Sequence, residues 1–220
     1  MCKAICGLQN LYPGSTSKEY FTEYGPNGKQ MNAAYTSSSV SGFSAPAFAV
    51  DGVGDIWTIA TDANGQTSVE ATNGPNGYSS ILDSFYVLSG PYTAVAAHGP
   101  WIAFGATNSV SWALSGPVLS SSPSLQRFGS SGNPGQGVLA MTFDNNGNLY
   151  YATNQGFGLT GIWFVNIPGA VAPSLNLNIA YQPSGIAVDS IHGRLYISNA
   201  STNKIEVYST STWLLLTTIE

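Results

Sequence analysis

The sequence predicts an all-β protein, and two observations support this prediction. One pattern recurs along the chain: an apolar strand ends in a turn, a glycine closes the turn, and a second strand opens with large apolar residues. The closing glycines, spaced 45, 48 and 46 residues apart, are Gly54, Gly99, Gly147 and Gly193. Short strands punctuated by Gly, Pro and Asn dominate, without sustained helical periodicity. Four short strands in each unit of about 45 residues predict a β-propeller of four-stranded antiparallel blades.

About five such units are visible, and together they form a single predicted domain, residues 1–220. The first copy is degenerate, since Leu11 and Tyr12 lie 45 residues before Ile56 and Trp57. The predicted units span residues 1–40, 41–88, 89–135, 136–180 and 181–220. One blade cannot bury both of its faces alone, so we expect the units to stack side by side.

Each strand of the unit has a predicted place. The first strand is mostly small and apolar, as in Ala94 and Val95, which suits an innermost strand crowded near a central axis. The second strand carries large residues that we expect to pack between blades, namely Trp57, Ile102, Tyr150 and Tyr196. Third strands are predicted at residues 67–71, 110–114, 162–166 and 204–208, and fourth strands at 175–179 and 213–219.

A second marker keeps the same period. Asp62, Asn108, Asn154 and Asn199 each follow a second strand, at spacings of 46, 46 and 45 residues. Because they occupy the same blade position, we expect them on one common face, where they are the candidate ligand-binding residues. The alternative interpretation is turn chemistry, since Asn and Asp side chains bond nearby backbone groups and tolerate positive φ.

A weak calcium site is a further candidate, formed by Asp144, Asn146 and Asn148 in an oxygen-rich turn. Asp51, Asp144 and Asp189 all precede such turns, so a role in capping the first hairpin is the simpler interpretation. His98 and His192 also fall in first-hairpin turns, and we expect them to be solvent-exposed there. We predict no catalytic residue, because neither a nucleophile elbow nor a phosphate loop nor a paired-carboxylate motif is present.

Charge excludes some partners. Only 8% of the residues are charged, the net charge is −5, and the six basic residues form no run. Binding to nucleic acid phosphates or to an anionic membrane needs clustered cations, so we expect neither partner. No apolar stretch approaches the roughly 20 residues of a membrane span. Cys2 and Cys6 are too few to staple a fold, and no signal peptide is visible after Met1.

Residues 45–220 resemble repeats of the NHL type, and more loosely the senescence-marker/gluconolactonase and virginiamycin B lyase propellers. The strongest match is residues 185–208, from Gly-Ile-Ala-Val-Asp through Gly-Arg-Leu-Tyr-Ile-Ser-Asn to Lys-Ile-Glu-Val-Tyr. The lactonase resemblance implies a divalent ion on the axis, held by Glu, Asn and Asp. Glu70 and Glu206 fall in third strands instead, away from the axis.

Propellers of these families have six or more blades, whereas five units fit here. This difference allows three interpretations. The ring closes with five blades, the chain is part of a longer protein, or another chain completes the arc by self-association. The functional expectation is a non-enzymatic scaffold without a cofactor that binds protein or glycan, at the surface of a microbial cell or outside it. The alternative is a metal-dependent lactonase-like hydrolase or virginiamycin B lyase-like enzyme that uses a divalent cation such as calcium.

Overall fold

All the secondary structure that the structure describes is β. The computed structural model describes residues 4–10, 19–24, 30–36, 48–50, 56–61, 67–72, 81–86, 92–106, 109–114, 126–129, 137–156, 159–167 and 174–220. Within these ranges the chain forms 19 strands in five antiparallel sheets. None of the described residues belongs to a helix that could cross a membrane.

The strands of each sheet are consecutive in the chain. The first sheet contains β1 (Ala4–Asn10), β2 (Glu19–Tyr24) and β3 (Gln30–Thr36). The second contains β4 (Phe48–Val50), β5 (Ile56–Thr61), β6 (Thr67–Thr72) and β7 (Ile81–Tyr86). The third contains β8 (Tyr92–His98), β9 (Trp101–Ala106), β10 (Ser109–Leu114) and β11 (Gln126–Gly129).

The last two sheets repeat the same order. The fourth contains β12 (Val138–Phe143), β13 (Asn148–Gly156), β14 (Leu159–Asn166) and β15 (Ser174–Ile179). The fifth contains β16 (Pro183–Asp189), β17 (Arg194–Asn199), β18 (Lys204–Ser209) and β19 (Leu215–Ile219). Four of the five sheets therefore have the predicted four strands, and each sheet is an uninterrupted up-and-down meander.

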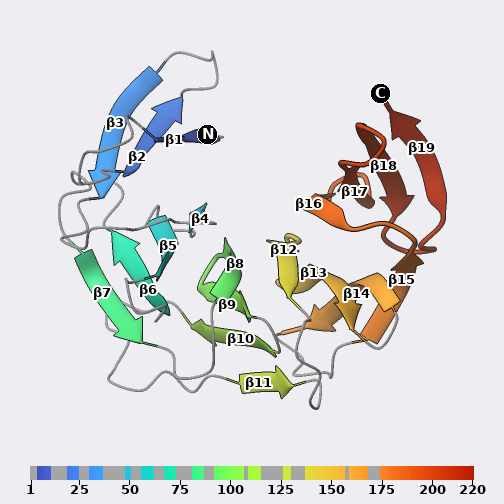
Figure 1. Ribbon diagram of the computed structural model, residues 1–220, viewed down its shortest axis with the longest axis horizontal. Coiled ribbons are helices and arrows are strands. Elements are labelled where there is room, and N and C mark those ends of the chain that lie inside the picture. The colour runs from blue at the N-terminus through green and yellow to red at the C-terminus, as the bar shows by residue number, and fades with distance from the viewer. Residues whose placement is uncertain are drawn as a thin grey trace.

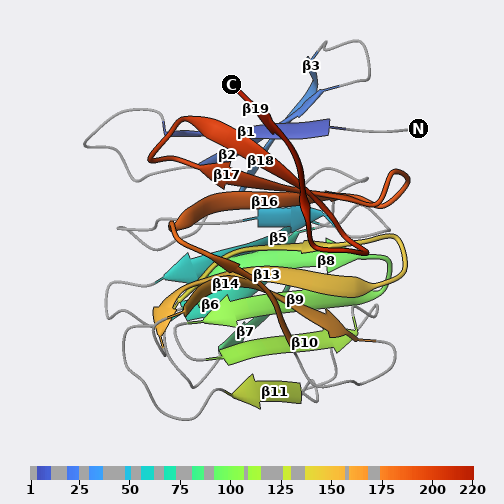
Figure 2. The same ribbon diagram turned by 90° about the vertical axis from the view of Figure 1, so that its right-hand side faces the viewer.

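The sheets are arranged radially around a common centre, as blades are. Figure 1 shows the first strands β4, β8, β12 and β16 nearest the centre, with β7, β11, β15 and β19 at the periphery. Figure 2 shows the same sheets from the side, with most of their strands running roughly horizontally across the view. Contacts between sheets run mainly through the inner strands, from β4 to β8, from β8 to β12 and from β12 to β16.

Small side chains allow the inner strands to lie close together. Ala94, Val95 and Ala96 on β8 are all buried, as expected for an innermost strand. Gly105 on β9 leaves room for the next sheet, because a Cβ there would lie 2.5 Å from the Cβ of Val138 on β12. The small residues of β8 therefore fit close packing near the centre, whereas Ala187 on the first strand of the fifth sheet is exposed.

Large apolar residues fill the space between neighbouring sheets. Trp57, Ile102 and Tyr150 are 3%, 1% and 4% exposed, as predicted for residues between blades. Tyr196, the fourth predicted residue, is only half-buried. One buried cluster joins the third and fourth sheets. A second cluster joins the fourth and fifth, and it contains Tyr150 together with Leu195 and Ile197 of β17.

The repeated turn glycine has a conformational cause. Gly99, Gly147 and Gly193 have φ values of 54°, 77° and 63°, in the left-handed region that only glycine adopts without strain. Gly54 lies outside the described residues. A glycine is therefore needed wherever the first hairpin closes, which explains its regular spacing.

The last strand begins later than the sequence predicts. Trp213 and Leu214 belong to the preceding turn: the Trp213 N–H donates to the Ser209 carbonyl at 2.9 Å, and the Ser209 N–H donates to the Leu214 carbonyl at 3.0 Å. Trp213 has a φ of 59°, which is incompatible with a strand. Its ring packs on Tyr150 and Phe164 of the fourth sheet, 6.0 and 6.4 Å between centroids.

Candidate functional site

The two described ligand-face candidates lie at the same end of neighbouring sheets. Asn154 is near the end of β13, and Asn199 is the last residue of β17. Because both strands are the second of their sheet, their ends point to the same side of the molecule. The other two candidates, Asp62 and Asn108, lie outside the described residues.

Both asparagine side chains hold local backbone in place. The Asn154 Oδ1 accepts a hydrogen bond from the Gly137 N–H at 2.7 Å, just before β12 begins. The Asn199 Oδ1 accepts from the N–H and the hydroxyl of Ser201 at 3.2 and 2.6 Å. Asn199 is only 5% exposed. The two asparagines therefore stabilise the backbone conformation at this end of the sheets. Asn199 does so as a buried residue.

An open pocket of about 630 Å³ lies at this end, between the fourth and fifth sheets. It is lined by Leu139 of β12, the connection from β15 to β16, and the turn that Asn199 caps. The lining residues are Leu139, Ala180, Tyr181, Gln182, Pro183, Ser184, Ala200 and Ser201. All of them are uncharged, and they combine apolar surface with hydroxyl and amide groups.

The carboxylate of Glu206 holds Tyr181, the one aromatic side chain of the pocket lining, in place. The Tyr181 hydroxyl donates to the Glu206 Oε2 at 2.9 Å, and the Tyr208 hydroxyl donates to the same oxygen at 2.6 Å. Burial, reinforced by the hydrogen bond to Glu206, raises the pKa of both phenols. Both therefore remain neutral donors at physiological pH, and Tyr181 is held by a charge-assisted hydrogen bond.

The pocket is suited to binding a neutral group. Its lining offers a tyrosine ring and apolar surface for contact, with hydroxyl and amide groups for hydrogen bonds. The lining contains Ser184 and Ser201 but no histidine, carboxylate or lysine that could act as their general base. Among the described residues, no three His, Cys, Asp or Glu side chains are grouped to hold a metal ion.

The calcium candidate lies in the first hairpin turn of the fourth sheet, where its carboxylate already accepts hydrogen bonds. The Asp144 Oδ1 accepts from the backbone N–H groups of Asn146 and Asn148 at 2.8 and 2.9 Å. The Asp144 Oδ2 accepts from the Asn148 amide at 2.7 Å. The pKa of nearby Tyr150 is raised to about 12, mainly because the phenol is buried and, to a smaller extent, because of the negative charge on Asp144. A bound cation would have to compete with these donors, and calcium binding stays a prediction.

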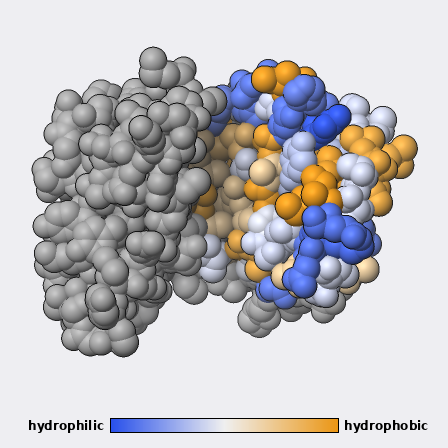
Figure 3. Space-filling view, turned by 90° about the horizontal axis from the view of Figure 1, so that it is seen from above, coloured by the Kyte–Doolittle hydropathy of each residue, from blue (hydrophilic) through white to orange (hydrophobic). Residues whose placement is uncertain are grey.

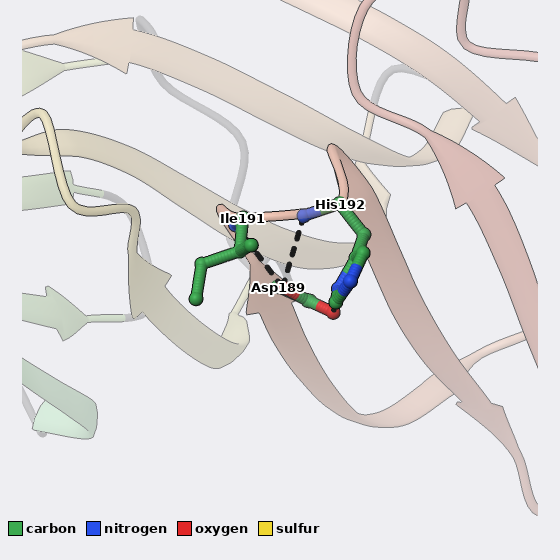
Figure 4. Close-up of polar contacts among 3 residues, drawn as sticks. All are labelled: Asp189, Ile191 and His192. Atoms are coloured by element: carbon green, nitrogen blue, oxygen red, sulfur yellow. Dashed lines mark hydrogen bonds and ion pairs between the residues drawn. The ribbon is translucent and has the colours of Figure 1, made fainter.

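The corresponding turn of the fifth sheet pairs a histidine with an aspartate (Figure 4). The His192 Nδ1 lies 2.6 Å from the Asp189 Oδ2, and the backbone N–H groups of Ile191 and His192 donate to the Asp189 Oδ1. The hydrogen bond from His192 is the main cause of the lowered pKa of the Asp189 carboxyl. The side chain of His192 is 61% exposed, as expected for a turn histidine. His98 instead ends β8 and is half-buried, with its ring 6.3 Å from the ring of Phe143.

The sequence alone did not identify most of the pocket. Tyr181 and Gln182 lie between the fourth strand of one unit and the first strand of the next, and Pro183 begins that first strand. The signal that could have found them is an aromatic residue in a short connection between two units. Asn199 was identified by its period, and the adjacent residues Ala200 and Ser201 line the pocket.

The chain is a β-propeller, an all-β protein built from radially arranged antiparallel sheets. It resembles a chain in a crystal structure of a nidogen/laminin complex, with 11% identity over 91% of this chain and 90% of that one, at a TM-score of 0.57. It also resembles a chain in a crystal structure of a mitotic checkpoint complex, with 8% identity and a TM-score of 0.57.

The second match covers 93% of this chain but only 63% of the other, so the present chain spans less than two thirds of that structure. Both structures contain β-propeller proteins, and at these identities the likeness shows the fold alone. No protein-family model matches the chain. No curated protein matches it in sequence.

Proposed function

We propose that this chain is a non-enzymatic, NHL-like β-propeller that binds a protein ligand through the pocket between its fourth and fifth sheets. The observation that supports the proposal best is the uncharged, open pocket with Tyr181 fixed at its wall. A peptide segment could place an apolar side chain against Leu139 and Tyr181 and bond to the hydroxyl groups around them. Tyrosine is enriched at such interfaces.

Two further observations fit this proposal. Both similar structures are protein complexes by their titles, so propellers of this shape do occur in protein assemblies. The low charge of the chain suits a neutral ligand, which includes the glycan alternative, and it motivates the proposed location on or outside a microbial cell. A cofactor has no part in this function.

The test uses a display library of random peptides, with a glycan array measured in parallel. Peptides enriched on the wild-type protein are titrated calorimetrically against two variants, each of which adds one exposed lysine. Ala200→Lys places the charge in the pocket wall, whereas Ile191→Lys places it in the first hairpin turn of the fifth sheet, at the opposite end of the strands. We expect Ala200→Lys to weaken binding about tenfold or more, because a desolvated charge is costly.

Ile191→Lys should leave the affinity unchanged. The proposal is wrong if no peptide is enriched, or if Ala200→Lys binds the enriched peptides as the wild type does. Binding of array glycans alone, lost in Ala200→Lys, would assign the pocket to glycans.

A further inference from the structure

The pocket between the fourth and fifth sheets is lined by three hydroxyl groups, and the hydrogen bonds around them show where each hydrogen points. These hydroxyls belong to Tyr181, Ser184 and Ser201. A hydroxyl carries a single hydrogen and two lone pairs, so it can donate only one hydrogen bond. A hydroxyl that already donates within the protein can therefore only accept a hydrogen bond from a ligand.

The hydrogen of the Ser201 hydroxyl is committed to Asn199. The Ser201 Oγ lies 2.6 Å from the Asn199 Oδ1, and the Ser201 backbone N–H donates to the same atom at 3.2 Å. Because a backbone N–H can only donate, that atom is the carbonyl oxygen of the amide, which can only accept. The Ser201 hydroxyl is therefore the donor in this contact.

Two consecutive hydrogen bonds fix the hydrogen of Ser184. The Ser198 hydroxyl donates to the Gly185 carbonyl oxygen at 3.1 Å, which uses the one hydrogen that Ser198 has. The Ser184 and Ser198 hydroxyl oxygens lie 2.8 Å apart, so Ser184 is the donor between them. Ser198 itself is not among the residues that line the pocket.

The hydrogen of Tyr181 is committed as well. Its hydroxyl donates at 2.9 Å to the Glu206 Oε2, and a carboxylate oxygen can only accept. All three hydroxyls thus present lone pairs to the pocket and no free hydrogen. Gln182, the remaining polar side chain of the lining, carries an amide that both donates and accepts.

We infer that the polar group that a ligand places in this pocket is a hydrogen-bond donor, namely the amide N–H of a peptide. This inference rests on the proposed function and names the chemistry that its ligand needs. Leu139 and Ala180 supply apolar contact beside the three acceptors. Figure 3 likewise shows apolar and hydrophilic residues side by side on the described part of the face in view. An ester or carboxylate oxygen would set lone pairs against lone pairs, and a site built to bond one type of group rejects an analogue that lacks it.

Three small probes of similar shape test this inference. N-methylbenzamide carries an N–H where methyl benzoate carries an oxygen, and N,N-dimethylbenzamide keeps the amide carbonyl without the N–H. We expect N-methylbenzamide to bind about fivefold tighter than either of the others, the order of affinity that one hydrogen bond contributes. Protein NMR titrations measure the three dissociation constants. Ala200→Lys, in the pocket wall, should weaken the binding of all three probes.

A variant outside the pocket lining should change the preference. In Ser198→Ala the Ser184 hydroxyl loses its acceptor and is free to donate to a ligand. Methyl benzoate should therefore bind Ser198→Ala about twofold or more tighter than it binds the wild type. Ser211→Ala is the matched control, in the turn between β18 and β19 at the opposite end of the fifth sheet, and should leave all three constants unchanged.

Several results would overturn the inference. They are equal binding of N-methylbenzamide and methyl benzoate, no binding of any probe, and probes that bind Ala200→Lys as they bind the wild type. A Ser198→Ala variant with the wild-type circular dichroism spectrum and the wild-type preference would overturn it too. The proposed function is judged separately: library peptides that bind the wild type and not Ala200→Lys support it even where the donor preference is absent.

Discussion

Single residues fix the shape of each hairpin. Gly147 and Gly193 close the first turn with a positive φ, and the aspartates that open these turns, Asp144 and Asp189, accept backbone N–H groups two to four residues ahead. The sequence predicted this chemistry because Asp and Gly at fixed spacing have a local meaning that does not depend on the rest of the fold. At this scale the sequence was therefore highly informative.

The glycine requirement leads to a prediction at position 193. Gly193→Ala should lower the free energy of unfolding by about 1–2 kcal/mol, because an L-residue is strained at positive φ. A Cβ at this position would meet only Thr210 Oγ1, at 3.4 Å, so packing adds little to the cost. Gly193→Asn is the control, since Asn tolerates the left-handed region better. Urea denaturation gives the free energy of unfolding of both variants. Equal stability of Gly193→Ala and the wild type would contradict the requirement for glycine at this turn.

Neighbouring sheets depend on each other through the residues between them. Leu195 and Ile197 of β17 are fully buried against the fourth sheet, whereas the residues of β19 are exposed throughout. The sequence predicted Trp57, Ile102 and Tyr150, which are buried, because large residues recur in the second strands. In the last unit it indicated Tyr196, whereas Leu195 and Ile197 are the residues buried against the fourth sheet. It did not predict the pocket, since Tyr181 and Gln182 lie in a connection whose composition carries no repeat.

Truncating one inter-sheet residue should cost far more than truncating an exposed one. Leu195→Ala is expected to lower the free energy of unfolding by about 2–5 kcal/mol, because it leaves a cavity between the fourth and fifth sheets. Leu215→Ala, with a side chain that is half exposed in the monomer, should change it by about 0.5 kcal/mol or less. Chemical denaturation at low protein concentration compares the two. Similar losses for both variants would place Leu195 outside a packed interface.

At the scale of the whole molecule, residues one repeat apart meet across neighbouring sheets. The Thr93 hydroxyl donates to the Val138 carbonyl at 2.5 Å, and the Asn145 N–H donates to the Ser190 hydroxyl oxygen at 2.9 Å. In each case the two residues are 45 positions apart. The period read from the sequence is thus the spatial step from one blade to the next. Only those candidate site residues that recur with this period, such as Asn154 and Asn199, could therefore be predicted from the sequence.

Cross-linking across one repeat tests this arrangement most directly. In a Cys2→Ser, Cys6→Ser background, Asn145→Cys and Ser190→Cys together should be joined within one molecule by a short bismaleimide. Asn145→Cys with Ser201→Cys is the control pair, because Ser201 lies in a turn at the opposite end of the fifth sheet. Peptide mapping of the folded monomer should find the first cross-link and not the second. Failure of the first pair to link, or equal linking of both, would contradict a radial stack of repeated sheets.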